Sequence, residues 1–120
     1  MGAGFWKDLP AEPMQMEGAR DVTKRVVVSP ADGWDGYVMR VFEMQPGGHT
    51  PRHRHDWPHI NVWLEGEGVL EIDGREHSLR PGSHAFVPAG ATHQFRAAGE
   101  GSSAFVCIVP EEGDPQGAGR

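Results

Sequence analysis

Four histidines stand at spacings that suit a metal site. His53 and His55 are two residues apart, His59 follows the short connection 56–58, and His93 lies in a separate segment. Side chains alternate between the two faces of a strand, so His53 and His55 point the same way. Neutral imidazole is a common ligand for zinc, copper, iron and nickel ions. The pattern therefore predicts that the four imidazoles hold one divalent transition metal ion.

Short strands joined by tight turns must position these side chains. The chain of 120 residues contains 17 glycines and 10 prolines, and its hydrophobic content of 38% suits one modest core. Asp73-Gly74 predicts a two-residue hairpin turn, because a type I′ turn needs positive φ and glycine adopts it readily. We expect a break at 46–48 and strands over residues 24–28, 36–44, 59–65, 69–72, 75–79, 85–87, 93–97 and 103–109. These elements, without a helix, predict an all-β closed barrel or jelly roll.

The chain is expected to fold as one domain with an extension at each end. Residues 1–20 show no sustained periodicity and are interrupted by Pro10, Pro13 and Gly18, which predicts a loose N-terminal arm. The barrel itself is expected over residues 21–110. Residues 111–120 are polar and rich in glycine and proline, which is typical of a flexible, disordered tail.

The composition argues against several classes of function. The formal net charge is −6 and the lysines are Lys7 and Lys24 alone, so a nucleic-acid-binding surface is not expected. No apolar stretch approaches the roughly 18 residues that a membrane span needs, and the first residues contain no apolar signal core. A single cysteine, Cys107, rules out an internal disulfide framework. These features predict a cytoplasmic protein.

Two motifs around the histidines resemble those of the cupin superfamily. The first is commonly written G-x5-HxH-x3,4-E-x6-G, and its positions are occupied here by Gly47, His53, His55, His59 and Gly66. The second is written G-x5-PxG-x2-H-x3-N, and its positions are occupied here by Gly82, Pro88, Gly90, His93 and Ala97. His59 stands where the family usually has glutamate, and Ala97 stands where asparagine is common.

The histidine at position 59 resembles the small four-histidine, manganese-type cupins. This resemblance implies a single cupin β-barrel, also called a double-stranded β-helix, that forms a homodimer and holds one divalent metal per chain. Manganese or iron is the expected ion, with copper, nickel or zinc as alternatives. Four neutral imidazoles leave the full 2+ charge of the ion, which makes bound water more acidic and binds anions more tightly. They also remove the carboxylate base of quercetinase-like and acireductone-type cupins.

Residues near His59 are candidates for the pocket around the metal. Asn61 and Trp63 share its strand parity, so Asn61 could donate a hydrogen bond to an oxygen atom held by the metal. Trp63 and Trp57 could form pocket walls, although aromatic packing explains both equally well. The opposite face of this strand is also apolar, which indicates a cover from the N-terminal arm or a partner subunit and favours a homodimer. That face consists of Ile60, Val62 and Leu64.

Other candidates lie on neighbouring segments. Phe105 and Cys107 share one face of the last strand, where core packing is the ordinary expectation for a free cysteine. If that face lines the pocket, Cys107 lies near the ion and could be oxidised during turnover. His49 and His84 lie near the motif strands and could orient ligands or relay protons. His77, just past the hairpin turn, is expected to be solvated.

Three classes of function fit this pattern. The first expectation is an oxygenase, in which a redox-active metal and dioxygen or peroxide oxidise a small, partly apolar substrate by C–C or C=C cleavage. The second is a non-redox isomerase or lyase that uses the metal as a Lewis acid, with His49 or His84 as its base. The third is a barrel that binds a metabolite or a metal without catalysis. The cupin fold alone does not decide among them, because it hosts many activities.

Overall fold

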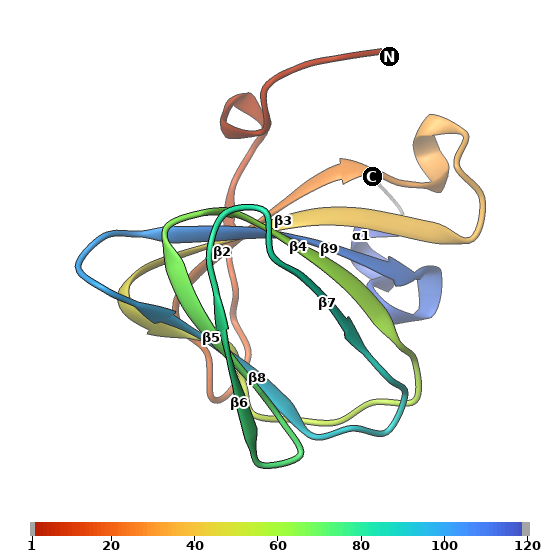
Figure 1. Ribbon diagram of the computed structural model, residues 1–120. Coiled ribbons are helices and arrows are strands. Elements are labelled where there is room, and N and C mark those ends of the chain that lie inside the picture. The colour runs from red at the N-terminus through yellow and green to blue at the C-terminus, as the bar shows by residue number, and fades with distance from the viewer. Residues whose placement is uncertain (1, 119–120) are drawn as a thin grey trace.

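Nine β-strands dominate the computed structural model, which describes residues 2–118 (Figure 1). They are β1 (Glu12–Pro13), β2 (Arg20–Val28), β3 (Tyr37–His49), β4 (His59–Glu65), β5 (Glu67–Ile72), β6 (Arg75–Leu79), β7 (His84–Val87), β8 (His93–Ala98) and β9 (Ser103–Pro110). The short helical elements are η1 (Trp6–Asp8), η2 (Pro30–Asp32), η3 (Glu111–Gly113) and α1 (Pro115–Ala118). The all-β barrel expected from the sequence is confirmed. None of the helices within residues 2–118 has the length and apolar character that crossing a membrane requires.

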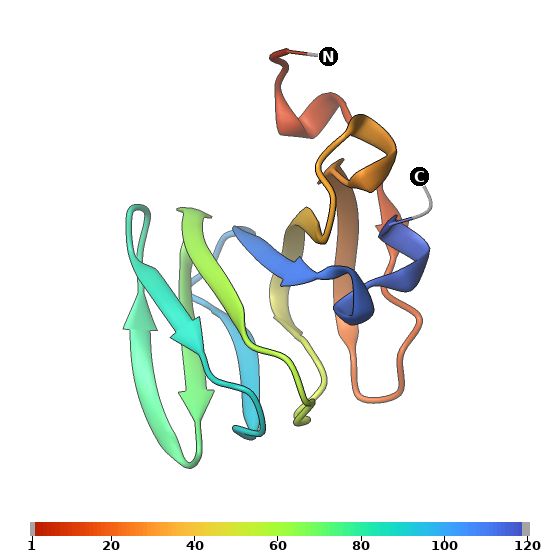
Figure 2. The ribbon, with the colours of Figure 1, turned by 90° about the vertical axis from the view of Figure 1, so that its right-hand side faces the viewer.

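The strands form one antiparallel sheet that curls into a nearly closed barrel. Their order is β6-β5-β8-β3-β9-β4-β7, with β2 paired to β3 and β1 paired to β2. Figure 2 shows β4, β5, β6 and β7 facing β2 and β3 across a shared interior. On β4 the burial alternates, so that His59, Asn61 and Trp63 are buried while Ile60 and Val62 are exposed. The interior therefore holds both the hydrophobic core and a histidine.

The hairpin between β5 and β6 turns at Asp73 and Gly74, as the sequence predicted. The φ angles are +47° at Asp73 and +85° at Gly74, and Ile72 pairs with Arg75 on either side of the turn. The backbone N–H of Asp73 donates to the Thr92 carbonyl at 2.8 Å, and the Thr92 N–H donates to Asp73 Oδ1 at 3.0 Å. The hairpin is thus tied to the residue just before β8 and helps to fix where that strand begins.

Strand β3 continues through Pro46-Gly47-Gly48, where the sequence predicted a break. Gly47 has a φ of +79°, and a Cβ added at Gly48 would lie 2.9 Å from backbone carbonyl oxygens of β2 and of β3 itself. The β2–β3 register also shifts here, which marks a β-bulge. The predicted break was wrong, because the glycines bend β3 without ending it. The strand runs on to His49, directly before the loop that carries His53.

Both end segments pack against the barrel. At the N-terminus β1 pairs with β2, and Met14 packs against the core. At the C-terminus Asp114 accepts hydrogen bonds from Lys24 at 3.0 and 2.8 Å. The expected absence of helix was wrong, because short helical elements form at both ends of the chain and after β2. The flexible tail over residues 111–120 stays a prediction, and residues 119–120 lie outside the described residues. The division into 1–20, 21–110 and 111–120 stays a prediction.

Stacked aromatic rings fill the interior beneath the histidines. The rings of Trp63 and Phe105 lie 5.0 Å apart at 8°, and those of Phe105 and Phe95 lie 4.3 Å apart at 24°. Trp63 Nε1 donates to the Gly66 carbonyl at 3.1 Å, so its polar atom is satisfied. Phe95 reaches up to the His59 ring at a centroid distance of 6.1 Å. The stack thus forms an apolar floor under the histidine cluster.

Gly68→Ala tests how tightly this floor is packed. A Cβ at Gly68 would collide with the Trp63 ring, which has no room to move against Phe105. We expect the free energy of unfolding to fall by about 2 kcal/mol, as measured by urea denaturation. In the matched control, Gly101→Ala, the added Cβ has nothing within 4 Å, and the change should stay below about 0.5 kcal/mol. Equal effects of the two substitutions would contradict this account of the core.

Candidate metal centre

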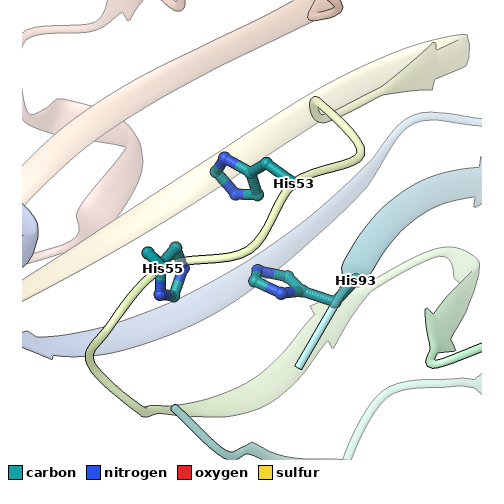
Figure 3. A group of neighbouring side chains, drawn as sticks. All are labelled: His53, His55 and His93. Atoms are coloured by element: carbon teal, nitrogen blue, oxygen red, sulfur yellow. The ribbon is translucent and has the colours of Figure 1, made fainter. Parts of the chain in front are cut away.

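Two backbone hydrogen bonds join the histidine-bearing segments. The His53 N–H donates to the His93 carbonyl at 3.1 Å, and the His93 N–H donates to the His53 carbonyl at 2.9 Å. The loop 50–58 is thereby held against the first residue of β8. Figure 3 shows the rings of His53, His55 and His93 directed from these two segments into the same space.

The turn before β8 also fixes His55. The Gly90 N–H donates to the His55 carbonyl at 2.7 Å, and Gly90 has a φ of +82°, which glycine adopts without Cβ strain. The His55 ring stacks on Trp57, with the centroids 4.7 Å apart and 7° between the planes. The Trp57 indole lies against Gly113 of η3, where an added Cβ would be 2.7 Å from its Nε1. His55 is therefore held by its backbone and by its ring.

The ring nitrogens of the four histidines converge. His53, His55 and His93 each offer one ring nitrogen, and these atoms lie within 4.8 Å of one another, so the three side chains could hold a metal ion. His59 joins the cluster through His93, because their Nε2 atoms are 3.1 Å apart. The structure therefore brings together all four histidines that the two motifs singled out.

The second ring nitrogen of three histidines faces an oxygen atom. The Nδ1 atoms lie 2.8, 2.7 and 3.0 Å from their acceptors in the pairs His55–Trp57 carbonyl, His59–Asn61 Oδ1 and His93–Ala91 carbonyl. These oxygens only accept hydrogen bonds, so each Nδ1 carries the proton and each Nε2 keeps a free lone pair. Partners of this kind set the tautomer and the orientation of metal-binding imidazoles.

The contact between His59 and His93 fits a shared cation. With both Nδ1 atoms protonated, the facing Nε2 atoms have lone pairs and no proton, so they repel each other unless a positive charge lies between them. Imidazole nitrogens bind transition metals at about 2.1 Å, and two of them at right angles are roughly 3.0 Å apart. The observed separation of 3.1 Å is close to this value. His53, His55 and His93 could thus hold a metal ion through nitrogen donors, and His59 lies directly against this group.

Burial keeps these imidazoles neutral. It lowers the pKa of His53, His59 and His93 from 6.5 to about 4, and it also lowers the pKa of His55. Desolvation is the largest cause at each of the four residues. The Arg40 guanidinium adds a smaller electrostatic effect that lowers the pKa of His53, His55 and His59. Because metals bind the neutral ring, all four histidines are ready as ligands at neutral pH.

His53, His55 and His59 line a cavity of about 330 Å³. Ligand pockets span roughly 300–1,000 Å³, so this one suits a small molecule. Its walls are largely apolar and include Met14, Phe42, Trp57, Phe95 and Phe105. Met14 comes from the N-terminal segment, so the barrel does not enclose the cavity alone.

Three of the other candidate residues lie in or beside this cavity. Phe105 and Cys107 line it, and the buried Cys107 thiol accepts a hydrogen bond from Arg40 Nη2 at 2.9 Å. Asn61 lies behind His59, and its amide nitrogen donates to the Val106 carbonyl at 3.3 Å. Asn61 therefore orients a histidine from behind, whereas the sequence suggested a hydrogen bond into the pocket.

Trp63, His49 and His84 are not among the described residues that line the cavity. Trp63 lies below it, in the aromatic stack. His49 Nδ1 lies 3.2 Å from the Thr50 carbonyl and 3.4 Å from Gln94 Nε2. His84 is exposed on β7, and His77 is exposed on β6. The expected relay roles of His49 and His84 find no support, because neither side chain reaches the cavity.

Arg40 is a charged pocket residue that sequence reasoning missed, as it missed the apolar wall residues Met14 and Phe95. It lies on β3 opposite Cys107, lines the cavity and has a side chain only 11% exposed. Val38 and Phe42, its neighbours two positions away, are buried core residues. Their shared parity was the available signal, because alternate residues of a strand face the same side.

The metal-free protein should lose stability as the pH falls from about 6.5 to about 4. In this window the unfolded histidines bind protons that His53, His59 and His93 do not bind in the folded state, since their folded pKa is about 4. Unfolding then takes up protons, so the free energy of unfolding falls as the pH is lowered and is unaffected by these groups above about pH 6.5. Urea denaturation after chelator treatment measures this slope.

A variant and its control separate the contribution of the buried histidines to this pH dependence from that of the carboxylates. His93→Gln removes one buried imidazole and should flatten the pH dependence. His77→Gln removes an exposed imidazole and should leave the slope as in the wild type. The same slope in both variants would show that burial of His93 is not its source.

The region that holds the site matches a known family. Residues 40–109 match the cupin domain family, and they include all four histidines, Arg40 and Cys107. A similar solved structure is that of the polyketide cyclase RemF from Streptomyces resistomycificus. It has a TM-score of 0.83 and 33% identity, over 92% of this chain and 79% of that chain.

Two curated relatives are longer than this chain. The 1-methylthio-D-xylulose 5-phosphate methylsulfurylase of Rhodospirillum rubrum is 34% identical over 95 residues, which are 79% of this chain and 60% of that protein. The 5-nitrosalicylic acid 1,2-dioxygenase of a Bradyrhizobium species is 31% identical over 65 residues, 54% of this chain and 31% of that protein. With the cyclase, these relatives carry three different activities on one fold. The matched region, the barrel and the paired motifs together show that the chain belongs to the cupin family.

Proposed function

We propose that this protein is a metal-dependent oxygenase that uses dioxygen or peroxide to oxidise or cleave a small organic substrate. His53, His55, His59 and His93 would hold one divalent ion, as in four-histidine, manganese-type cupins. The observation that carries the proposal is the convergence of their ring nitrogens beside a small, largely apolar cavity. The dioxygenase among the relatives supports the same class of reaction.

Manganese or iron is the ion we propose, with copper next and nickel or zinc as alternatives. A redox-active ion of this kind supplies the electron transfer that dioxygen or peroxide chemistry needs. Four nitrogen ligands complete a tetrahedral zinc site, which suits a structural role, but they do not complete a six-coordinate ion. The open cavity beside the histidines supports the second arrangement.

In this proposal, the residues of the chain orient the histidine rings and exclude water from the cavity. Asn61 and the carbonyls of Trp57 and Ala91 keep the Nδ1 protons of three histidines in place. Phe105 and its aromatic neighbours keep the cavity wall dry, which strengthens electrostatic interactions inside it. Cys107 faces the same cavity, so its thiol is a target for oxidation during turnover.

A non-redox isomerase or lyase is the second candidate. The polyketide cyclase among the similar structures favours it. It needs a base beside the substrate, and His49 and His84 were the residues expected to serve. Neither lines the cavity, which favours the oxygenase. A barrel that binds a metal or metabolite without turnover is the third candidate.

Metal content tests the four-histidine site. Protein from cells supplied with manganese, iron, copper, nickel and zinc should contain about one redox-active ion per chain by elemental analysis. The His53→Ala/His93→Ala double variant should lose it, because it removes a ligand from each of the two segments. The matched control, His77→Ala/His84→Ala, removes two exposed histidines and should retain the ion.

Turnover separates the three functions. Substrate-dependent oxygen consumption that is lost in the His53→Ala/His93→Ala variant supports the oxygenase. Turnover with zinc or magnesium under nitrogen supports the Lewis-acid enzyme, and substrate binding without turnover supports the binding barrel. Zinc alone in the wild type, or equal metal content in the two double variants, would sink the oxygenase proposal.

We also propose a homodimer formed through the outer face of β4 and β7. Ile60, Val62 and Phe86 are 50%, 40% and 58% exposed there, and Ile60 pairs directly with Phe86. Leu64 on the same face of β4 packs in a cluster with Trp6 from the N-terminal segment. The arm therefore covers one end of this apolar face and leaves the other open, and an open apolar patch of this kind favours association.

A charge placed in this patch tests the dimer. Wild-type protein should have twice the chain mass by light scattering, and Phe86→Glu should shift it to the monomer, because a buried unpaired carboxylate disfavours the interface. Ser78→Glu places the same charge on the exposed strand β6 and should leave the dimer intact. A monomeric wild type would contradict the proposal.

A further inference from the structure

A charged side chain lies in the cavity beside the histidines. Arg40 is paired with Cys107 across β3 and β9, and it lines the same cavity as the histidine rings. Its side chain is only 11% exposed. The guanidinium lies 4.8 Å from the centroid of the Phe42 ring, so apolar atoms cover part of it. Arg40 is thus a buried cation at an inward-facing position of the barrel.

The partners of Arg40 compensate its charge incompletely. Its Nη1 lies 3.5 Å from Asp114 Oδ2, whereas Lys24 Nζ lies 3.0 and 2.8 Å from the two oxygens of the same carboxylate. Its Nη2 donates to the Cys107 sulfur, which is a weak acceptor. Its Nε is buried without a hydrogen-bond partner among the described residues. Burial of an undercompensated cation costs free energy, so an additional anion would be bound favourably.

The cavity offers no acidic side chain to Arg40. The described residues that line it include no aspartate or glutamate, and Arg54 adds a second positive charge. The remaining walls are largely apolar, with Met14, Phe95 and Phe105 among them. A space of about 330 Å³ with these walls suits a molecule that has an apolar body and one negative group.

We propose that Arg40 binds the carboxylate of the substrate, and that the substrate class is a small monocarboxylate with an apolar body. This inference rests on the proposed function, in which the histidine site holds the reacting end of the same molecule. An Nη donor of Arg40 exchanges the thiol of Cys107 for a carboxylate oxygen, which is a much stronger acceptor. Arg40 thereby determines which molecules enter and which end faces the histidines.

A carboxylate fits this surrounding better than a phosphate ester. One guanidinium provides a single positive charge and a planar fork, which matches a planar carboxylate. A phosphate dianion is commonly held by several donors at once, such as the backbone N–H groups at the start of a helix. Here the side chains around Arg40 include the ring of Phe42 and the thiol of Cys107, which are poor partners for a second negative charge.

Calorimetric titration of manganese-loaded protein with benzoate, benzamide and phenyl phosphate tests this inference. Wild-type protein should bind benzoate about tenfold more tightly than neutral benzamide, and more tightly than phenyl phosphate. Arg40→Gln should lose about tenfold in benzoate affinity with little change for benzamide, and Arg40→Lys should fall between. Arg52→Gln is the matched control, because it removes the same charge from a residue that pairs with Glu71 outside the cavity. It should change the affinity for benzoate by less than about twofold.

The metal content of each protein keeps the two proposals apart. If the wild type holds no metal, the proposed function fails, while Arg40-dependent preference for benzoate in that same protein still supports the inference. If Arg40→Gln keeps its metal and binds benzoate as tightly as the wild type, the inference is overturned and the metal site stands. Equal binding of benzoate and benzamide by the wild type, or tighter binding of phenyl phosphate, overturns it even where Arg40→Gln does not fold.

Discussion

The backbone pairing between the loop 50–58 and the segment 90–95 is the constraint on which the rest of the site depends. The loop has no strand structure of its own, yet it carries two of the four histidines. Three backbone ties hold it, in the pairs Thr50–Phe95, His53–His93 and His55–Gly90. Because each tie fixes a residue that would otherwise move, the conformational entropy of the loop is lost when the barrel folds. The fold itself therefore brings the four histidines together.

The position of the histidines also determines the charge of the cavity. His59 and His93 are buried above the aromatic stack and His53 and His55 are partly buried, and this burial disfavours the charged forms of all four imidazoles. Arg40, which lies among them, acts in the same direction. The described residues that line the cavity therefore include the guanidiniums of Arg40 and Arg54 and three histidine rings, but no carboxylate. Any divalent ion that enters adds positive charge to a surrounding that is already positive, and an anionic ligand relieves that excess.

Local sequence patterns predicted the architecture well, but they could not predict contacts between residues that are distant in the sequence. Asp73-Gly74 and the two histidine motifs act within a few residues, so turn chemistry and strand parity were enough to interpret them. Pro46-Gly47-Gly48 was misread because whether glycines end a strand or bend it depends on the strand beside them. The anchoring of Asp114 on Lys24 joins residues 90 positions apart, which no local pattern reports. The inward position of Arg40 could have been read from its parity, but a charged residue contradicts the hydrophobic pattern by which inward faces are recognised.

The contact between Trp57 and Gly113 links the histidine cluster to the C-terminal segment. Trp57 supports His55 twice, through its carbonyl and through its stacked indole, and the edge of that indole rests on a residue that has no side chain. A side chain added at Gly113 would therefore displace the indole and, through it, the ring of His55. In evolutionary terms, a substitution in the segment that follows the barrel would shift the position of His55 while all four histidines stay unchanged.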